Sequence, residues 1–301
     1  MPSMRTNGID IFYDEVGDPR APALLLIMGL GTQMIGWPEA LCGRLADRGF
    51  RVIRFDNRDV GLSTKMENAP KVDLAAAFMR ALAGQPVEAA YSLDDMAKDA
   101  IGLMDALGLA KAHIVGASMG GMIAQIIAAK YRARVRSLVS IMSSSGDPKL
   151  PQAKPAAAAL LIAPRPATSD REASIEFSMN VYRVLGSPGY PTPDPELRAK
   201  AERSMDRSLY PAGSARQLLA IMANGSNVDL LKTIDVPTLV LHGEDDPLVP
   251  VEAGKDTARN TPGAVLKIIP GWGHDIPTEL IPTLVEATAT HCQNADRAAA
   301  A

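Results

Sequence analysis

The residues with the clearest chemistry form the pattern G-x-S-x-G centred on Ser118, directly after the strand-like run 112–115. A serine hydroxyl is a weak nucleophile unless it is exposed next to a base. A sharp turn between a strand and a helix exposes it, and small residues such as Gly116 and Gly120, two places to either side, let the backbone turn without clashes. The pattern alone is common by chance. Its place between a predicted strand and a predicted helix indicates that Ser118 is a nucleophile.

A serine nucleophile needs a histidine base, and the chain contains four histidines. When the serine lies on a turn of this kind, the acid and then the histidine follow it along the chain. His113 precedes the serine and His242 precedes the candidate acids, so we expect both to be structural. His291 lies near the end of a predicted helix, where we expect it at the surface. His274 follows the last predicted strand in the glycine-rich sequence PGWGH, and we predict that it is the base.

The candidate acids lie in the loop after a predicted strand at 238–242. In open parallel sheets, catalytic groups gather at the carboxyl ends of the strands, where this loop begins. Glu244, Asp245 and Asp246 are all near enough by sequence, so spacing leaves the three open. Asp147, after the neighbouring predicted strand, is an alternative, but its place before a proline favours a turn residue.

Hydrophobic patterning predicts strands that alternate with helices. The predicted strands cover 9–16, 23–28, 51–55, 112–115, 135–142, 238–242 and 264–269. The predicted helices cover 37–48, 74–82, 92–107, 119–131, 173–185, 195–208, 251–260 and 278–292. Alternation of this kind predicts βαβ units and a mostly parallel sheet, and the unbroken apolar run at 23–28 is typical of a strand buried on both faces.

The alternation stops at about residue 143 and resumes at about residue 237. The segment between is rich in alanine, proline, methionine and arginine and contains helical stretches. We therefore predict a core formed by 1–143 and 229–292, a helical cap inserted at 144–228, and a frayed tail at 293–301.

Composition limits the functional classes. The chain has 301 residues, of which 47% are hydrophobic and 22% charged, as in globular proteins. A net charge of −3 provides no basic field for nucleic acid. Cys42 and Cys292 are isolated and show no metal-ligand spacing, and neither a signal peptide nor an apolar run of membrane-spanning length is evident. We expect a cytoplasmic protein with no metal, no cofactor, no nucleic acid and no membrane partner, while the oligomeric state is not indicated.

Three motifs, GASMGG, HGEDDPLVP and GWGH, resemble the nucleophile, acid and base loops of the α/β-hydrolase superfamily, and the resemblance extends over nearly the whole chain. It implies an α/β-hydrolase fold, with a mostly parallel sheet flanked by helices and an inserted helical cap. In this superfamily the acid usually stands three residues after the glycine, which selects Asp246. The segments LLLIMGLGTQMIGWP and ADRGFRVIRFDNRDVGLS are closer to aclacinomycin methylesterase-like bacterial carboxylesterases, which share the pair Arg58 and Asp59.

Two backbone N–H groups must receive the oxyanion of a tetrahedral intermediate. Met119, directly after the nucleophile, supplies one of them. The alignment with the superfamily implies that Leu30 supplies the other, although this chain has Met28 where relatives carry a histidine. The polar cluster 56–59 is expected to be an ion-paired loop that stiffens the rim of this site rather than a metal site.

Several side chains are candidates for the pocket lining. Met34, Trp37 and Met142 are expected there, and the flexible thioethers of the two methionines suit an apolar pocket. An alternative for Trp37 is that it anchors the helix that follows.

The sequence thus predicts a cofactor-free serine carboxylic-ester hydrolase for small to medium, largely apolar esters, with methyl esters among them. Ser118, His274 and Asp246 would form the triad. A perhydrolase or a carbon–carbon bond hydrolase would use the same triad, and a ligand-binding receptor on the same scaffold is a further alternative.

Overall fold

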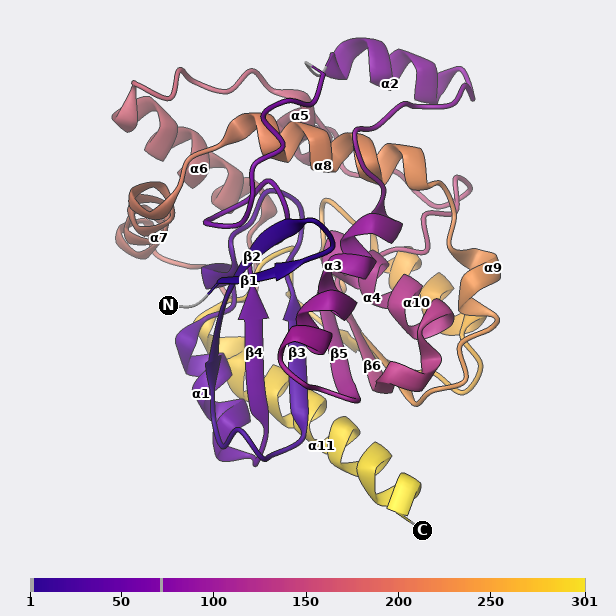
Figure 1. Cartoon of the computed structure of the whole chain (residues 1–301). Coiled ribbons are helices and arrows are strands. Elements are labelled where there is room, and N and C mark those ends of the chain that lie inside the picture. The colour runs from indigo at the N-terminus through magenta and orange to yellow at the C-terminus, as the bar shows by residue number, and fades with distance from the viewer. Residues whose placement is uncertain (1–2, 71–72, 301) are drawn as a thin grey trace.

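Eight strands form one sheet in the order β1-β2-β4-β3-β5-β6-β7-β8 (Figure 1). The computed structural model describes residues 3–70 and 73–300. In chain order the strands are β1 Ser3–Thr6, β2 Ile9–Val16, β3 Ala23–Ile27, β4 Arg51–Phe55, β5 Ala112–Ala117, β6 Val135–Ile141, β7 Thr238–Gly243 and β8 Val265–Ile269. The β1–β2 and β2–β4 pairs are antiparallel, and the pairs from β4 to β8 are parallel. The predicted mostly parallel sheet is confirmed.

Helices cover both faces of the sheet. Outside residues 144–227 the helices are α1 Glu39–Asp47, α2 Leu74–Leu82, α3 Leu93–Ala106, α4 Met119–Lys130, α9 Val228–Leu231, α10 Val251–Asn260 and α11 Ile281–Ala300. Helices α3 and α4 pack on one face of the sheet, and α1 and α11 pack on the other (Figure 1).

The strand β3 shows why its sequence is apolar throughout. Successive side chains of a strand point to opposite faces. Leu25 and Ile27 therefore pack against α3 and α4, whereas Leu24 and Leu26 pack on the side of α1 and α11. Both faces are covered, so no position of this strand meets water, as expected for a central parallel strand.

The segment between β6 and β7 contains four further helices, α5 Pro155–Ile162, α6 Arg171–Leu185, α7 Asp194–Arg207 and α8 Pro211–Asn224. They lie over the carboxyl ends of the strands (Figure 1). The helix α2, which belongs to the core by sequence, lies beside α8. The helices α5 and α8 had no clear sequence signal, and each begins with a proline in its first turn, where the missing N–H costs nothing. The division into a core and a cap at 144–228 stays a prediction.

The last helix is longer than predicted. We expected it to end at residue 292 with a frayed tail, but α11 continues through Ala300, so the prediction is wrong for residues 293–300. Asp296 anchors this extension, because its carboxylate accepts a hydrogen bond from Arg136 at 2.8 Å and lies 3.3 Å from Nε2 of the buried His113. Alanines favour the helix further. Residue 301 lies outside the described residues.

No helix of the described residues combines the length and the apolar character needed to cross a bilayer.

Candidate active site

Ser118 occupies a strained turn between β5 and α4. Its backbone angles are φ 56° and ψ −123°, a region that side-chain-bearing residues rarely adopt. Glycines make the turn feasible: a Cβ on Gly116 would lie 2.1 Å from the carbonyl oxygen of Gly120, and a Cβ on Gly120 would lie 2.1 Å from that of Ile27. Strain of this kind persists where surrounding structure enforces it, and it is found mainly at functional sites.

His274 lies between Ser118 and Asp246. Its Nε2 is 3.0 Å from the Ser118 hydroxyl oxygen, and its Nδ1 is 2.7 Å from Oδ2 of Asp246. The other carboxylate oxygen of Asp246 accepts hydrogen bonds from the backbone N–H groups of Leu248 and Val249, at 2.9 and 2.8 Å. Because these two bonds fix the carboxylate, it holds the imidazole in one orientation and fixes Nδ1 as the protonated nitrogen.

The other candidate acids do not reach the histidine. Asp245 instead accepts a hydrogen bond of 2.9 Å from the Gly271 N–H, which ties the acid loop to the base loop. Glu244 is exposed. Asp147 accepts from the N–H of Lys149, two residues on, as expected of a turn residue. The structure thus places Asp246, the acid that the family resemblance selected, beside His274.

Two other histidines have structural contacts. Nδ1 of His113 lies 2.8 Å from the Ser137 hydroxyl, and burial lowers the pKa of this imidazole to about 4. Nε2 of His242 lies 2.8 Å from the carbonyl oxygen of Val249, within the loop that holds Asp246. Burial lowers the pKa of His242 as well, so both side chains are neutral at pH 7.

The loop after β3 passes directly over the serine. A Cβ on Gly29 would lie 2.9 Å from the Cβ of Ser118, so this close approach requires glycine. The next N–H, that of Leu30, and the N–H of Met119 at the start of α4 have no hydrogen-bond partner within residues 3–70 and 73–300. Both predicted oxyanion donors are therefore free near the nucleophile.

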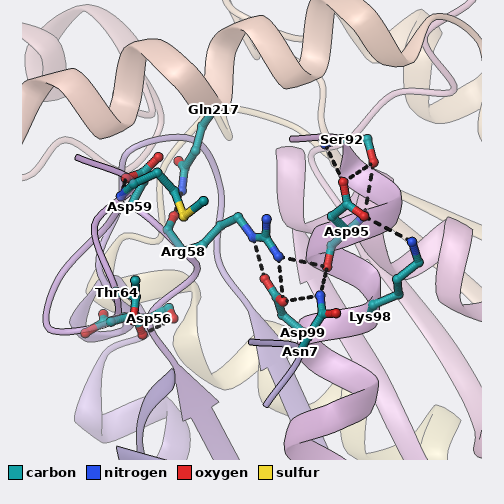
Figure 2. A network of polar contacts seen from close by, with 12 residues as sticks. Asn7, Asp56, Arg58, Asp59, Thr64, Ser92, Asp95, Lys98, Asp99 and Gln217 are labelled. Carbon is teal, nitrogen blue, oxygen red and sulfur yellow. Dashed lines mark hydrogen bonds and ion pairs between the residues drawn. The ribbon is translucent and has the colours of Figure 1, made fainter. Parts of the chain in front are cut away.

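The polar cluster 56–59 is an ion-paired loop, as predicted. Arg58 forms a bidentate pair with Asp99 of α3 at 2.6 and 2.7 Å, shown in Figure 2. Asp59 forms a second bidentate pair, at 2.8 Å for both bonds, with Arg216 of α8. Burial raises the pKa of Asp59, but the Arg216 guanidinium, the Met66 N–H and Tyr91 together outweigh burial, and the net shift is downward. This loop therefore links the sheet to the helices above it.

A cavity of about 240 Å³ opens beside Ser118 and His274. Its apolar lining includes Met28, Leu30, Met142, Leu160, Leu161 and Leu218. Met142, one of the predicted lining residues, also has a left-handed backbone with φ 40°.

Met34 and Trp37 do not line the cavity, so their assignment to the pocket was wrong. A 3-10 turn at Met34–Gly36 directs both side chains into the core, where each is 1% exposed, and Trp37 packs with α1 on the sheet. The neighbouring Gln33 and Ile35 face the cavity instead. The alternative expectation, that Trp37 anchors its helix, fits this packing.

The family model described as alpha/beta hydrolase fold matches residues 22–279. The chain belongs to the α/β hydrolase fold family. Rhodomycin D methylesterase DnrP of Streptomyces peucetius is 26% identical, over 95% of this α/β hydrolase and 96% of that protein. The bifunctional esterase/perhydrolase DCH of Acinetobacter calcoaceticus is 25% identical, over 90% and 92%. The solved structure of a meta-cleavage product hydrolase (CumD) from Pseudomonas fluorescens has a TM-score of 0.76 at 22% identity, with 98% of each chain covered. The resemblance to methylesterase-like proteins is thereby confirmed.

One residue without a sequence signal contacts the loop 28–31 after β3, called the oxyanion loop below because it carries the predicted donor Leu30. Gln217 of α8 is fully buried and lies above Arg58 in Figure 2. Its Oε1 accepts a hydrogen bond from the Gly31 N–H, and its Nε2 donates to the carbonyl oxygen of Arg58, both at 2.8 Å. A glutamine among the helical residues 211–224 gives no signal of such a contact, because its partners lie about 160 to 190 positions away along the chain.

Further contacts tie the end of α6 and the segment after it to the loop that carries His274. The His274 N–H donates to the carbonyl oxygen of Leu185 at 2.7 Å, and the Gly273 N–H donates to the Ser187 hydroxyl at 2.9 Å. Residues between β6 and β7 therefore hold the backbone around His274. Nothing in the sequence indicated that these two segments are in contact.

Proposed function

We propose that this α/β hydrolase is a serine carboxylic-ester hydrolase with Ser118, His274 and Asp246 as its catalytic triad. The continuous hydrogen-bonded path supports this proposal most directly: 3.0 Å from the Ser118 hydroxyl to Nε2 of His274, and 2.7 Å from Nδ1 to Asp246. Both distances fall within the range in which a base can take the proton of a nucleophile.

The reaction follows from these positions. The Ser118 oxygen attacks the ester carbonyl while Nε2 of His274 takes the hydroxyl proton, and Asp246 stabilises the imidazolium that forms. The tetrahedral intermediate collapses when the same nitrogen gives its proton to the departing alkoxide, which leaves an acyl-enzyme. A water molecule, deprotonated by His274, then attacks the acyl carbon, and the acid is released with the serine restored.

Negative charge on the carbonyl oxygen is stabilised by the free N–H groups of Leu30 and Met119. The Met119 N–H lies at the amino end of α4, where the helix dipole adds partial positive charge. A donor of this kind typically contributes about 10²- to 10³-fold in rate.

The substrates we propose are small to medium esters with a largely apolar part next to the ester bond. The aliphatic lining of the cavity supports this class, because buried apolar surface favours apolar substrate groups. The similarity to a protein named rhodomycin D methylesterase supports methyl esters within the class.

A second candidate activity is perhydrolysis, in which hydrogen peroxide replaces water in the attack on the acyl-enzyme. The similarity to a protein named esterase/perhydrolase supports it. Peracid formation from a simple ester in the presence of peroxide, measured beside ordinary hydrolysis, separates the two activities.

Labelling with a fluorophosphonate tests the proposal. We expect the probe to form one covalent adduct, which peptide mass spectrometry assigns to Ser118, and we expect ester hydrolysis to fall by at least about 10³-fold in a Ser118→Ala variant. Full hydrolysis by that variant, or an adduct on another residue, would refute the assignment. A chain that binds esters but turns none over would instead be a receptor.

A further inference from the structure

We propose that the cavity contains a carboxylate-binding subsite centred on Lys200, so that the preferred esters carry a free carboxylate away from the bond that is cleaved. This inference rests on the proposed esterase function and narrows its substrate class. It places a charged contact within a cavity that is otherwise mainly aliphatic.

Lys200 belongs to α7 and faces the same cavity as Ser118 and His274. Its neighbours on the helix, Leu197 and Ala201, are buried against α6. The Lys200 ammonium nitrogen lies 4.7 Å from the centre of the Tyr182 ring, another cavity residue. Packing of the helix and the aromatic contact thus hold the ammonium group at the cavity wall.

Within the described residues 3–70 and 73–300, no carboxylate oxygen lies within 4.0 Å of the Lys200 ammonium nitrogen, and Asp275 acts on it from a greater distance. The contrast with an ordinary surface lysine is clear: Lys98 of α3 lies 3.0 Å from a carboxylate oxygen of Asp95. A lysine without a contacting counter-ion at a partly desolvated wall favours an anion from outside the chain, because the charge has lost water and gained no direct ion pair.

The charged groups around Lys200 act in opposite directions. Burial lowers the pKa of Lys200, Asp275 opposes this shift, and Arg203 reinforces it. The carboxylate of Asp275 is engaged by the Ser187 hydroxyl, and burial raises its pKa. His274, which also lines the cavity, is committed to its contacts with Asp246 and Ser118.

Two arginines extend the positive region of the cavity lining. Arg203, one turn beyond Lys200, has one carboxylate partner among the described residues, Glu39, at 3.9 Å between exposed side chains. The Arg165 guanidinium lies 4.6 Å over the Phe177 ring and forms no ion pair within the described part of the chain. The lining therefore has three cations and one acid, although the whole chain has a net charge of −3.

A carboxylate suits this wall better than a larger anion. The cavity of about 240 Å³ must also hold the ester group beside Ser118, which leaves room for a short chain between the two. An ammonium is a compact point charge that can bind a carboxylate from several directions. Half-esters of short dicarboxylic acids combine both features: hydrolysis adds the water oxygen to the acyl carbon, gives a proton to the alcohol and leaves a dicarboxylate.

The test compares monomethyl adipate with its neutral carboxamide counterpart, methyl 5-carbamoylpentanoate. We expect the wild-type enzyme to favour the acid ester in kcat/KM, and a Lys200→Met variant to lose about 10- to 100-fold of that preference, the range contributed by a hydrogen bond to a charged group. Lys98→Met removes a charge of the same sign from the surface and should leave the preference unchanged. Equal rates for both esters in the wild type, or an unchanged preference in Lys200→Met, would overturn the subsite.

A binding measurement separates failure of the subsite from failure of the esterase function. In a Ser118→Ala background, adipate should raise the melting temperature more than adipamide does, and Lys200→Met should remove the difference. Adipate binding without hydrolysis of any ester would contradict the proposed function and keep the subsite. Ester hydrolysis without adipate binding would contradict the subsite and keep the proposed function.

Discussion

Replacing Gln217 by leucine tests whether α8 holds the oxyanion loop in place. The two side chains are similar in size, but leucine can neither accept the hydrogen bond of the Gly31 N–H nor donate to the carbonyl oxygen of Arg58. Since Gln217 is fully buried, water cannot replace these bonds without rearrangement. The adjacent Leu30 N–H would then no longer be fixed over the serine.

Two effects follow, and their sizes can be estimated separately. Each buried group left without a partner costs about 1–3 kcal/mol, so the free energy of unfolding should fall by about 2–6 kcal/mol. An oxyanion donor contributes about 10²- to 10³-fold in rate, so partial loss of its position should lower kcat by about 10- to 100-fold. The KM for a neutral ester should change less, because the bond to the Leu30 N–H strengthens mainly in the transition state.

Gln125 provides a matched control. It is a fully buried glutamine with a hydrogen bond at each end, to the carbonyl oxygen of Ser144 at 3.2 Å and from Asn227 at 3.1 Å, and it does not contact the oxyanion loop. Gln125→Leu should therefore lose comparable stability in urea unfolding while keeping most of its kcat. If the Gln217 and Gln125 variants lose the same share of kcat, Gln217 is structural only and the reasoning about the oxyanion loop is refuted.

Three further predictions concern the ion pairs and the histidines. Arg216→Met should lower the free energy of unfolding by about 3–5 kcal/mol in urea titrations, because it leaves the buried Asp59 carboxylate unpaired, and a loss below about 1 kcal/mol would contradict this. Asp246→Asn should lower kcat by about 10³- to 10⁴-fold through loss of the correct imidazole tautomer, while fluorescence-monitored binding of a substrate ester stays near the wild-type level. His113 has a pKa of about 4 when folded and about 6.5 when unfolded, so the unfolded chain binds more protons between these values and stability falls as the pH drops through them. This histidine accounts for up to about 3 kcal/mol of that fall, so unfolding of a His113→Gln variant should depend less on pH between 6.5 and 4, and identical slopes would argue against it.

Local patterns predicted most elements of the core. The strand β2 and the helices α2 and α10 have the predicted bounds. Ser92 caps α3 in a capping box in which Asp95 replaces the usual glutamate. The strand β1 was not predicted, since four residues give little periodicity and its position depends on pairing with β2. The extent of α11 was underestimated, because the contacts of Asp296 with residues distant in the chain are invisible to local patterns.

Candidate catalytic residues on short loops could be predicted where their residue type is scarce in the chain. Four histidines and the order of the motifs sufficed to select His274, and the family spacing selected Asp246 from three adjacent acids. The pocket lining could not be read in the same way, because side chains of a short turn such as the one at Met34 can face either the core or the cavity. Gln217 and Lys200 were missed because their partners come together only when α7 and α8 fold over the sheet.

The central claim is that Ser118 forms an acyl-enzyme with His274 as its base. Rapid-quench mass spectrometry during turnover of p-nitrophenyl acetate tests it directly. We predict a burst of p-nitrophenol together with a transient acetyl adduct on the peptide that contains Ser118, and neither in a His274→Ala variant. Steady turnover that depends on Ser118 and His274 while the peptide stays unmodified would contradict a covalent mechanism, and an acetyl adduct on a different residue would contradict the assigned nucleophile.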